Sequence, residues 1–175
     1  MKILLLVIVG VIATIVLLVG VAALIGSRLS KSHIATRSIF LRQSPQNVYD
    51  VIRDFSSAPA WRSDVKRVEV QTQPNGKVHL REEGKNGAVN HELAEDVPGK
   101  RMAPRILDTD LGYSGKWTYV FAPENGGARV TITEDGEVSN ALFRFMSRYV
   151  FGHTATLDAY LSSLARRFGE DTTPQ

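Results

Sequence analysis

Histidine is the side chain in this sequence best suited to proton transfer near neutral pH, because its unperturbed pKa is about 6.5. The chain of 175 residues has four histidines, at positions 33, 79, 91 and 153, and no cysteine. No two of them lie three or four positions apart and no His-Glu-x-x-His motif occurs, so the spacing predicts no metal site. The lack of cysteine excludes disulfides, thiolate zinc sites and thiol nucleophiles.

Two of these histidines fall on apolar patterns and are candidates for an internal site. His91 lies between Val89 and Leu93 on one face of a predicted strand, and His153 lies on the apolar face of the last predicted helix. A histidine held in a cavity could act as a general base or hydrogen-bond a ligand oxygen. The simpler interpretation of both is a satisfied, partly buried histidine without a chemical role.

Two carboxylates fall on strand positions from which they could point inward. Glu82 shares a strand face with Leu80, and Glu134 continues the face of Ile132. A carboxylate in that position needs a charged or hydrogen-bonding partner, or else its pKa rises. More often such a residue marks where a strand leaves the core. Three residues remain as candidates for catalysis: His91, His153 and Glu82.

Motifs for nucleotides, nucleophiles and nucleic acids are missing from the sequence. Neither a Walker loop nor Gly-x-Gly-x-x-Gly occurs, and residues 112–115 are one residue short of Gly-x-Ser-x-Gly. Beyond Lys2 the chain has 20 basic and 18 acidic residues, which is too even for a nucleic-acid-binding surface. The sequence therefore predicts no cofactor and no nucleic-acid partner.

One apolar segment at the amino terminus stands apart from the rest of the composition. Residues 3–25 contain no charge and 20 apolar side chains, and as a helix they would be about 35 Å long, enough to cross a hydrocarbon layer of about 30 Å. A cleaved signal peptide has a shorter apolar core of roughly 7–15 residues, so an uncleaved anchor over residues 1–26 is favoured. A signal peptide cleaved after Ala23 is the alternative.

The side of the membrane is predicted from the basic residues that flank this segment. Lys2 lies before it, whereas Arg28, Lys31, Arg37 and Arg42 follow it with no acidic residue before position 50. Basic residues collect on the cytoplasmic side of membrane proteins, so the carboxy-terminal domain is predicted to be cytoplasmic, in a single-pass protein.

After a linker at 27–32, strand and helix signals alternate in a definite order. Residues 33–41 are predicted as a strand. Ser44 can cap a helix that starts at Pro45 and repeats apolar residues at helical spacing up to Phe55, and a short second helix follows at 56–61. Period-2 patterns separated by turn residues then predict six strands, at 65–73, 77–83, 88–96, 101–109, 113–122 and 128–138.

Three Asn-Gly pairs mark turns between these strands, at 75–76, 86–87 and 125–126. The last element is predicted as one long amphipathic helix over residues 140–168, weakened by Gly152 in its middle. A seven-stranded antiparallel sheet curls, and one helix laid across it cannot fill the concave side, so an α+β domain with an internal cavity is expected. The predicted lining is Trp61, His91, Leu93, Ile106, Trp117, Tyr119, Met146, Tyr149 and His153.

Four segments carry a resemblance to a known superfamily: SPQNVYDVIRDF at 44–55 with Pro59 and Trp61, GKWTY at 115–119, GGARVTI at 126–132, and the closing helix with Leu161 and Leu164. Over residues 33–169 the sequence resembles the SRPBCC, START-like (Bet v 1-like) superfamily, in particular its polyketide cyclase/dehydrase and lipid-transport group. The resemblance implies a helix-grip fold around an apolar cavity and no particular reaction. Residues 170–175 are expected to form a disordered tail.

These observations favour a membrane-anchored module that binds or transports a hydrophobic small molecule such as a lipid, quinone, isoprenoid or polyketide-like compound. An enzyme of the cyclase or dehydratase kind, using a histidine or glutamate in the same cavity, is the alternative. A second alternative is an interaction module whose cavity is vestigial.

Overall fold

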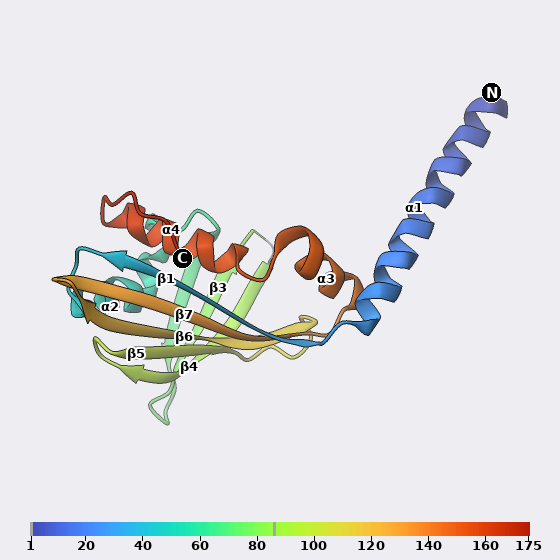
Figure 1. Ribbon diagram of the computed structural model, residues 1–175. Helices are drawn as coiled ribbons and strands as arrows, with labels where there is room; N and C mark the ends of the chain where they lie inside the picture. Colours follow the sequence, from blue (N-terminus) through green and yellow to red (C-terminus); the bar gives the residue numbers. More distant parts are fainter. Residues whose placement is uncertain (1, 86) are drawn as a thin grey trace.

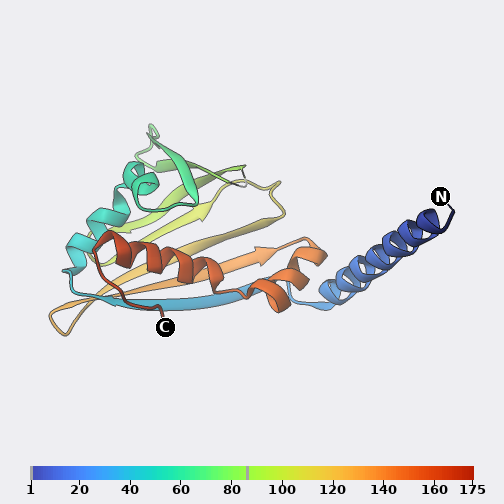
Figure 2. The same cartoon turned by 90° about the horizontal axis from the view of Figure 1, so that it is seen from above.

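A curved, fully antiparallel sheet of seven strands forms the body of the protein, and helices cover its concave side (Figures 1 and 2). The computed structural model describes residues 2–85 and 87–175. The strand order is β1-β7-β6-β5-β4-β3-β2, so the first strand pairs with the last and all other neighbours are consecutive. The strands are β1 (Ser32–Leu41), β2 (Val65–Thr72), β3 (Val78–Gly84), β4 (Gly87–Val97), β5 (Arg101–Ile106), β6 (Tyr113–Glu124) and β7 (Gly127–Val138).

The two short helices between β1 and β2 form where the local sequence predicts them. The Ser44 hydroxyl accepts a hydrogen bond of 3.1 Å from the backbone N–H of Asn47, and Pro45 occupies the first turn of α2 (Pro45–Arg53). A 3-10 helix, η1 (Phe55–Ala60), continues the chain toward β2. Local signals suffice here because capping and proline geometry act within a few residues.

Tight turns join the consecutive strands. Asn125 and Gly126 have φ angles of 46° and 79°, the left-handed pair that an Asn-Gly hairpin requires between β6 and β7. Gly76 has a φ of 81° in the turn before β3. The third predicted Asn-Gly turn includes Asn86, which lies outside the described residues.

The carboxy-terminal helix differs from the single helix predicted over residues 140–168. It consists of α3 (Ala141–Met146), one turn of π-helix, η2 (Ser147–Phe151), and α4 (Ala155–Arg167). The break lies at Gly152, whose φ of 76° and ψ of 157° are accessible almost only to glycine. The apolar stripe is therefore divided between two helices that face different surroundings.

The hydrophobic core lies between the sheet and the helices α2 and α4. Its largest fully buried side chains come from five strands or helices and include no charged group. They are Ile39, Leu41, Val48, Met102, Val130, Ile132, Leu157, Leu161 and Leu164. Each such aliphatic side chain contributes about 1.5–3 kcal/mol through burial. The packing of α4 against the sheet therefore provides much of the stability of the domain.

The two ends of the chain are attached to the domain at different places. The apolar helix α1 (Lys2–Arg28) projects away from the body, and its carboxyl end packs against α3 (Figure 1). Residues 170–175 differ from the predicted disordered tail, because Gln175 and Ser38 of β1 exchange two backbone hydrogen bonds of 2.8 and 2.9 Å. The Glu170 carboxylate also accepts from the backbone N–H of Arg42.

Candidate functional site

Aromatic rings fill the space between α4 and the middle of the sheet. Tyr160 of α4 is surrounded by Trp61, Trp117 and Tyr119, with ring centroids 5.4, 5.5 and 5.7 Å away. Tyr119 and Tyr160 are buried, and the two tryptophans are partly buried. We assign these three predicted cavity residues to core packing, where edge-to-face contacts add to the free energy of burial.

A partly buried ion pair lies directly beside this aromatic cluster. The guanidinium of Arg62 is 5.1 Å from the ring centroid of Tyr160 and donates two hydrogen bonds, of 2.8 and 2.9 Å, to the Glu82 carboxylate. It donates a third, of 2.7 Å, to Asp64. Glu82 therefore has the cationic partner that an inward carboxylate requires, and its oxygens are already engaged by Arg62.

Two N–H groups in this region have no hydrogen-bond partner among the described residues. They are the indole Nε1 of Trp61 and the Nε of Arg62, both buried and adjacent in sequence. A buried donor without an acceptor costs about 1–3 kcal/mol. Neither residue lines the pockets described below, so these two donors are a local cost of packing beside the Arg62–Glu82 pair.

His91 lies on β4 near the same ion pair. It pairs with Leu80 on β3 and Ile106 on β5, and burial lowers its pKa from the usual value of 6.5. The negative charges of Glu82 and Asp108 act in the opposite direction. His91 is consequently neutral at pH 7, and a neutral imidazole can accept a proton or a hydrogen bond.

His153 lies elsewhere, between η2 and α4. Its ring stacks on that of His33 from β1, with centroids 4.4 Å apart, and burial lowers its pKa. His33 shares a hydrogen bond of 2.9 Å with Glu134, whose other oxygen accepts one of 2.9 Å from the Trp117 indole. The predicted inward position of Glu134 is thus occupied by a partnered carboxylate.

The three catalytic candidates do not form one constellation. Glu82 and His91 lie on the neighbouring strands β3 and β4, but His153 packs beside β1, and three strands separate β1 from β4. The buried tyrosines are not bases near pH 7 either, because burial raises the pKa of Tyr160 to about 12 and that of Tyr119 well above 10. Among the groups beside the aromatic cluster, His91 is therefore the one suited to proton transfer near pH 7.

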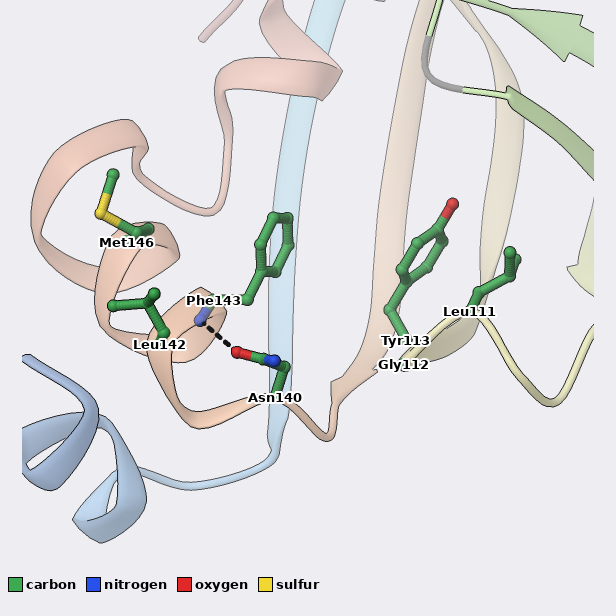
Figure 3. A pocket seen from close by; sticks show the side chains of 7 residues that line it. All are labelled: Leu111, Gly112, Tyr113, Asn140, Leu142, Phe143 and Met146. Carbon is green, nitrogen blue, oxygen red and sulfur yellow. Dashed lines mark hydrogen bonds between the residues drawn. The ribbon is translucent and has the colours of Figure 1, made fainter. Parts of the chain in front are cut away.

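An apolar pocket lies away from the aromatic cluster, between α3 and the start of β6 (Figure 3). Its volume of about 410 Å³ falls within the usual range for small-molecule sites. The rings of Phe143 and Tyr113 stand on opposite sides of it, and the Asn140 side chain caps α3 by accepting from the N–H of Phe143. The lining is Leu111, Gly112, Tyr113, Asn140, Leu142, Phe143 and Met146.

Among the residues predicted to line a cavity, Met146 lines this pocket. Leu93 belongs to the core cluster, Ile106 borders a more polar hollow of about 350 Å³ at β5, β6 and β7, and Tyr149 is largely exposed. The predicted lining did not include the other six residues of this pocket, which are Leu111, Gly112, Tyr113, Asn140, Leu142 and Phe143. Leu142 and Met146 lie four residues apart, and this helical spacing could have indicated that they share a face. Leu111 lies in a loop, where no periodic pattern marks it.

Metal binding would require several histidine or acidic side chains grouped around one point. Among the residues described here, no group of three histidine, aspartate or glutamate side chains is placed to hold a metal ion. The acidic groups near the interior are instead engaged by arginine, histidine or tryptophan, as for Glu82 and Glu134.

The class of protein follows from the fold together with a family match over most of the chain. Residues 32–169 match the family model for polyketide cyclase/dehydrase and lipid transport, and the chain belongs to this family. Its sheet and closing helix are those of a START-like protein, as the sequence predicts. Membership supports a module for a hydrophobic ligand. No curated protein matches the sequence.

Solved structures show the same fold at low sequence identity. The START superfamily protein from Mycobacterium smegmatis is 13% identical, with a TM-score of 0.59 over 77% of this chain and 96% of that one. The Zhui aromatase/cyclase from Streptomyces sp. R1128 is 14% identical, with a TM-score of 0.58 over 78% and 96%. The di-domain ARO/CYC StfQ from the steffimycin biosynthetic pathway is 11% identical, with a TM-score of 0.63 over 79% of this chain. The chain spans about half the length of StfQ, 52%.

Proposed function

We propose that this protein is a membrane-anchored module that binds a hydrophobic small molecule in the pocket between α3 and β6. The observation that carries the proposal is the pocket itself, about 410 Å³ and lined by five apolar side chains among seven residues. Apolar lining with a few polar groups is typical of sites for apolar ligands. The family, which includes lipid transport, supports the same class of ligand.

The anchor is proposed from the apolar helix α1. This helix has 27 residues and a mean hydropathy of 3.2 in its most apolar window, so it is long and apolar enough to cross a membrane. Its last turn is part of a packed contact with α3, in which Arg144 donates a hydrogen bond of 2.8 Å to the carbonyl oxygen of Gly26. Gly26 follows Ala23, so this contact is kept whether or not the segment is cleaved, and the uncleaved anchor is proposed from the length of the apolar run alone.

The orientation is proposed to place the domain in the cytoplasm. Arg28 and Lys31 follow the anchor closely and only Lys2 precedes it, which favours this side by the distribution of basic residues. Because the chain has no cysteine, a Val97→Cys variant carries one exposed thiol on β4. We expect a membrane-impermeant maleimide to label it only after the cells are lysed. Labelling in intact cells would place the domain outside.

The ligand is tested with the full chain purified in detergent. Organic extraction followed by mass spectrometry should recover an apolar compound from the wild-type protein. Met146→Trp fills the pocket and should reduce recovery several-fold, whereas Val97→Trp, the same large side chain at an exposed site, should leave it unchanged. Equal recovery from all three proteins, each folded by circular dichroism, would show that the compound lies outside this pocket and would contradict the proposal.

A further inference from the structure

A run of large apolar side chains is exposed on the helix that borders the pocket. Phe143 on α3 and three consecutive residues of η2, Tyr149, Val150 and Phe151, are 49, 59, 56 and 58% exposed. We call these four residues the α3–η2 patch. Single exposed apolar residues are ordinary on soluble proteins, but three consecutive ones together with a fourth on the adjoining helix favour a docking surface.

The patch is fixed to the end of the anchor by specific contacts. Gly26 of α1 is buried against α3, and a Cβ atom there would overlap the carbonyl group of Ala141. Arg144 joins the two helices to the sheet, because its guanidinium donates to the carbonyls of Gly26, Val138 and Ser139 at 2.8, 3.1 and 2.8 Å. The patch therefore lies where the chain leaves α1, and both views of the fold show α3 beside that end (Figures 1 and 2).

The two segments that carry the patch and the end of α1 are basic, although the exposed Asp110 and Glu137 lie at the neighbouring strand ends. Residues 26–31 and 140–153 contain four basic side chains and no acidic one. Arg144 is engaged internally, but Arg28, Lys31 and Arg148 are exposed. Aromatic side chains at the interface combined with basic residues able to meet anionic headgroups are typical of segments that rest on a bilayer.

From these observations we infer that the α3–η2 patch docks on the bilayer that holds α1, so that the pocket opens onto lipid. The pocket and the patch share Phe143, which places the opening at the membrane surface. This inference rests on the proposed anchor. It adds that the domain lies against the membrane instead of hanging free on the linker, and that apolar ligands reach the pocket without crossing water.

The test uses single-cysteine variants of the full chain, which has no native cysteine. Phe151→Cys and Tyr149→Cys report on the patch, Val97→Cys on an exposed apolar position at the end of the sheet near α2, and Val16→Cys on α1. Each is labelled with an environment-sensitive fluorophore and reconstituted into nanodiscs of phosphatidylcholine and phosphatidylglycerol. Some of the lipids carry a nitroxide quencher at the top of the acyl chain, and in a parallel sample for position 16, at the middle of α1, the nitroxide is near the end of the acyl chain.

Lipid-borne nitroxide is expected to quench the labels at 151 and 149 several-fold more than the label at 97. Quenching at 151 and 149 no greater than at 97, with strong quenching at 16, would overturn the docking inference and leave the anchor intact. Absence of quenching at 16 would overturn the anchor and the docking together. A patch that instead binds a second copy would show fluorophore self-quenching at 151 without any effect of the lipid quencher, which also overturns the inference.

Discussion

The two halves of the closing helix end up in different environments, although the sequence presents one apolar stripe. In α4, Leu157, Leu161 and Leu164 are fully buried against the sheet, and Tyr160 is surrounded by aromatic rings. In α3 and η2, by contrast, Tyr149 and its neighbours are more than half exposed beside an apolar pocket. Helical periodicity identifies which residues need an apolar partner, but it does not say whether that partner is the core, a ligand or a membrane.

The largest difference between the halves is expected in stability. Leu161→Ala should lower the free energy of unfolding by about 2–5 kcal/mol, because it leaves a cavity in a fully packed region. Phe151→Ala removes a larger side chain but should change stability by less than about 0.5 kcal/mol, because that ring is 58% exposed. Urea unfolding of the full chain in detergent, followed by tryptophan fluorescence, measures both. Equal losses would mean that η2 is packed as tightly as α4.

Arg144 should be the next most sensitive position, because it holds the open half of the closing helix, α3 and η2, in place. Arg144→Ala leaves the carbonyls of Gly26, Val138 and Ser139 without this donor, and about 2–3 kcal/mol of stability should be lost. Arg148→Ala, one turn further on and exposed, is the matched control and should be near neutral. Limited proteolysis offers a second readout, with faster cleavage after Arg28 expected in the first variant alone.

A smaller effect is expected at the boundary between the halves. Gly152→Ala forces a side chain into a backbone conformation that only glycine adopts readily and should cost about 1–2 kcal/mol. Gly20→Ala, in a helical position with no neighbouring atom within 4 Å, should leave thermal unfolding of the domain unchanged. If Gly152→Ala were instead stabilising, the uninterrupted helix that the sequence predicts would be an accessible state.

Much of the fold follows from short-range sequence signals. Ser44 and Pro45 begin α2, and Asn125-Gly126 joins β6 to β7, because capping and positive φ angles are decided within a few residues. The alternation of the strands allows inward positions for Glu82 and Glu134 but favours the interpretation that they mark where a strand leaves the core; in the structure both carboxylates have partners. Glu82 is bound by Arg62, and Glu134 is bound by His33 and Trp117. These partners come from parts of the chain distant in sequence, so no local pattern identifies them.

The site was less predictable than the fold, for a related reason. The cavity was expected between the closing helix and the middle of the sheet, but aromatic packing around Tyr160 occupies that space. The pocket forms instead between α3 and the start of β6, ahead of the break at Gly152, and Leu111 lines it from a loop without periodicity. The position of the break is visible in the sequence, whereas the position of the pocket is a tertiary effect.

The smallest effect should come from His91, which is partly buried on β4 beside the Arg62–Glu82 ion pair. Burial lowers the pKa of His91 in the folded state below its unfolded value of 6.5, so the unfolded chain binds more protons as the pH falls. Its contribution to stability is therefore full above pH 6.5 and declines as the pH falls from there through the folded pKa. The melting temperature of His91→Asn should fall less than that of wild type between pH 7.5 and 5. A parallel fall in both proteins would show that His91 does not contribute.

The difference between the packed and the open half is tested most directly by photo-crosslinking with an apolar diazirine-bearing fatty acid. The full chain is reconstituted into nanodiscs, irradiated and mapped by peptide mass spectrometry. The predicted adducts lie on the pocket residues Leu111, Tyr113, Leu142 and Met146, with few or none on Leu157, Leu161 or Tyr160. Adducts concentrated on the α4 half, around Tyr160 and Trp61, would contradict the central claim that the ligand binds at the open end of the grip, beside the membrane.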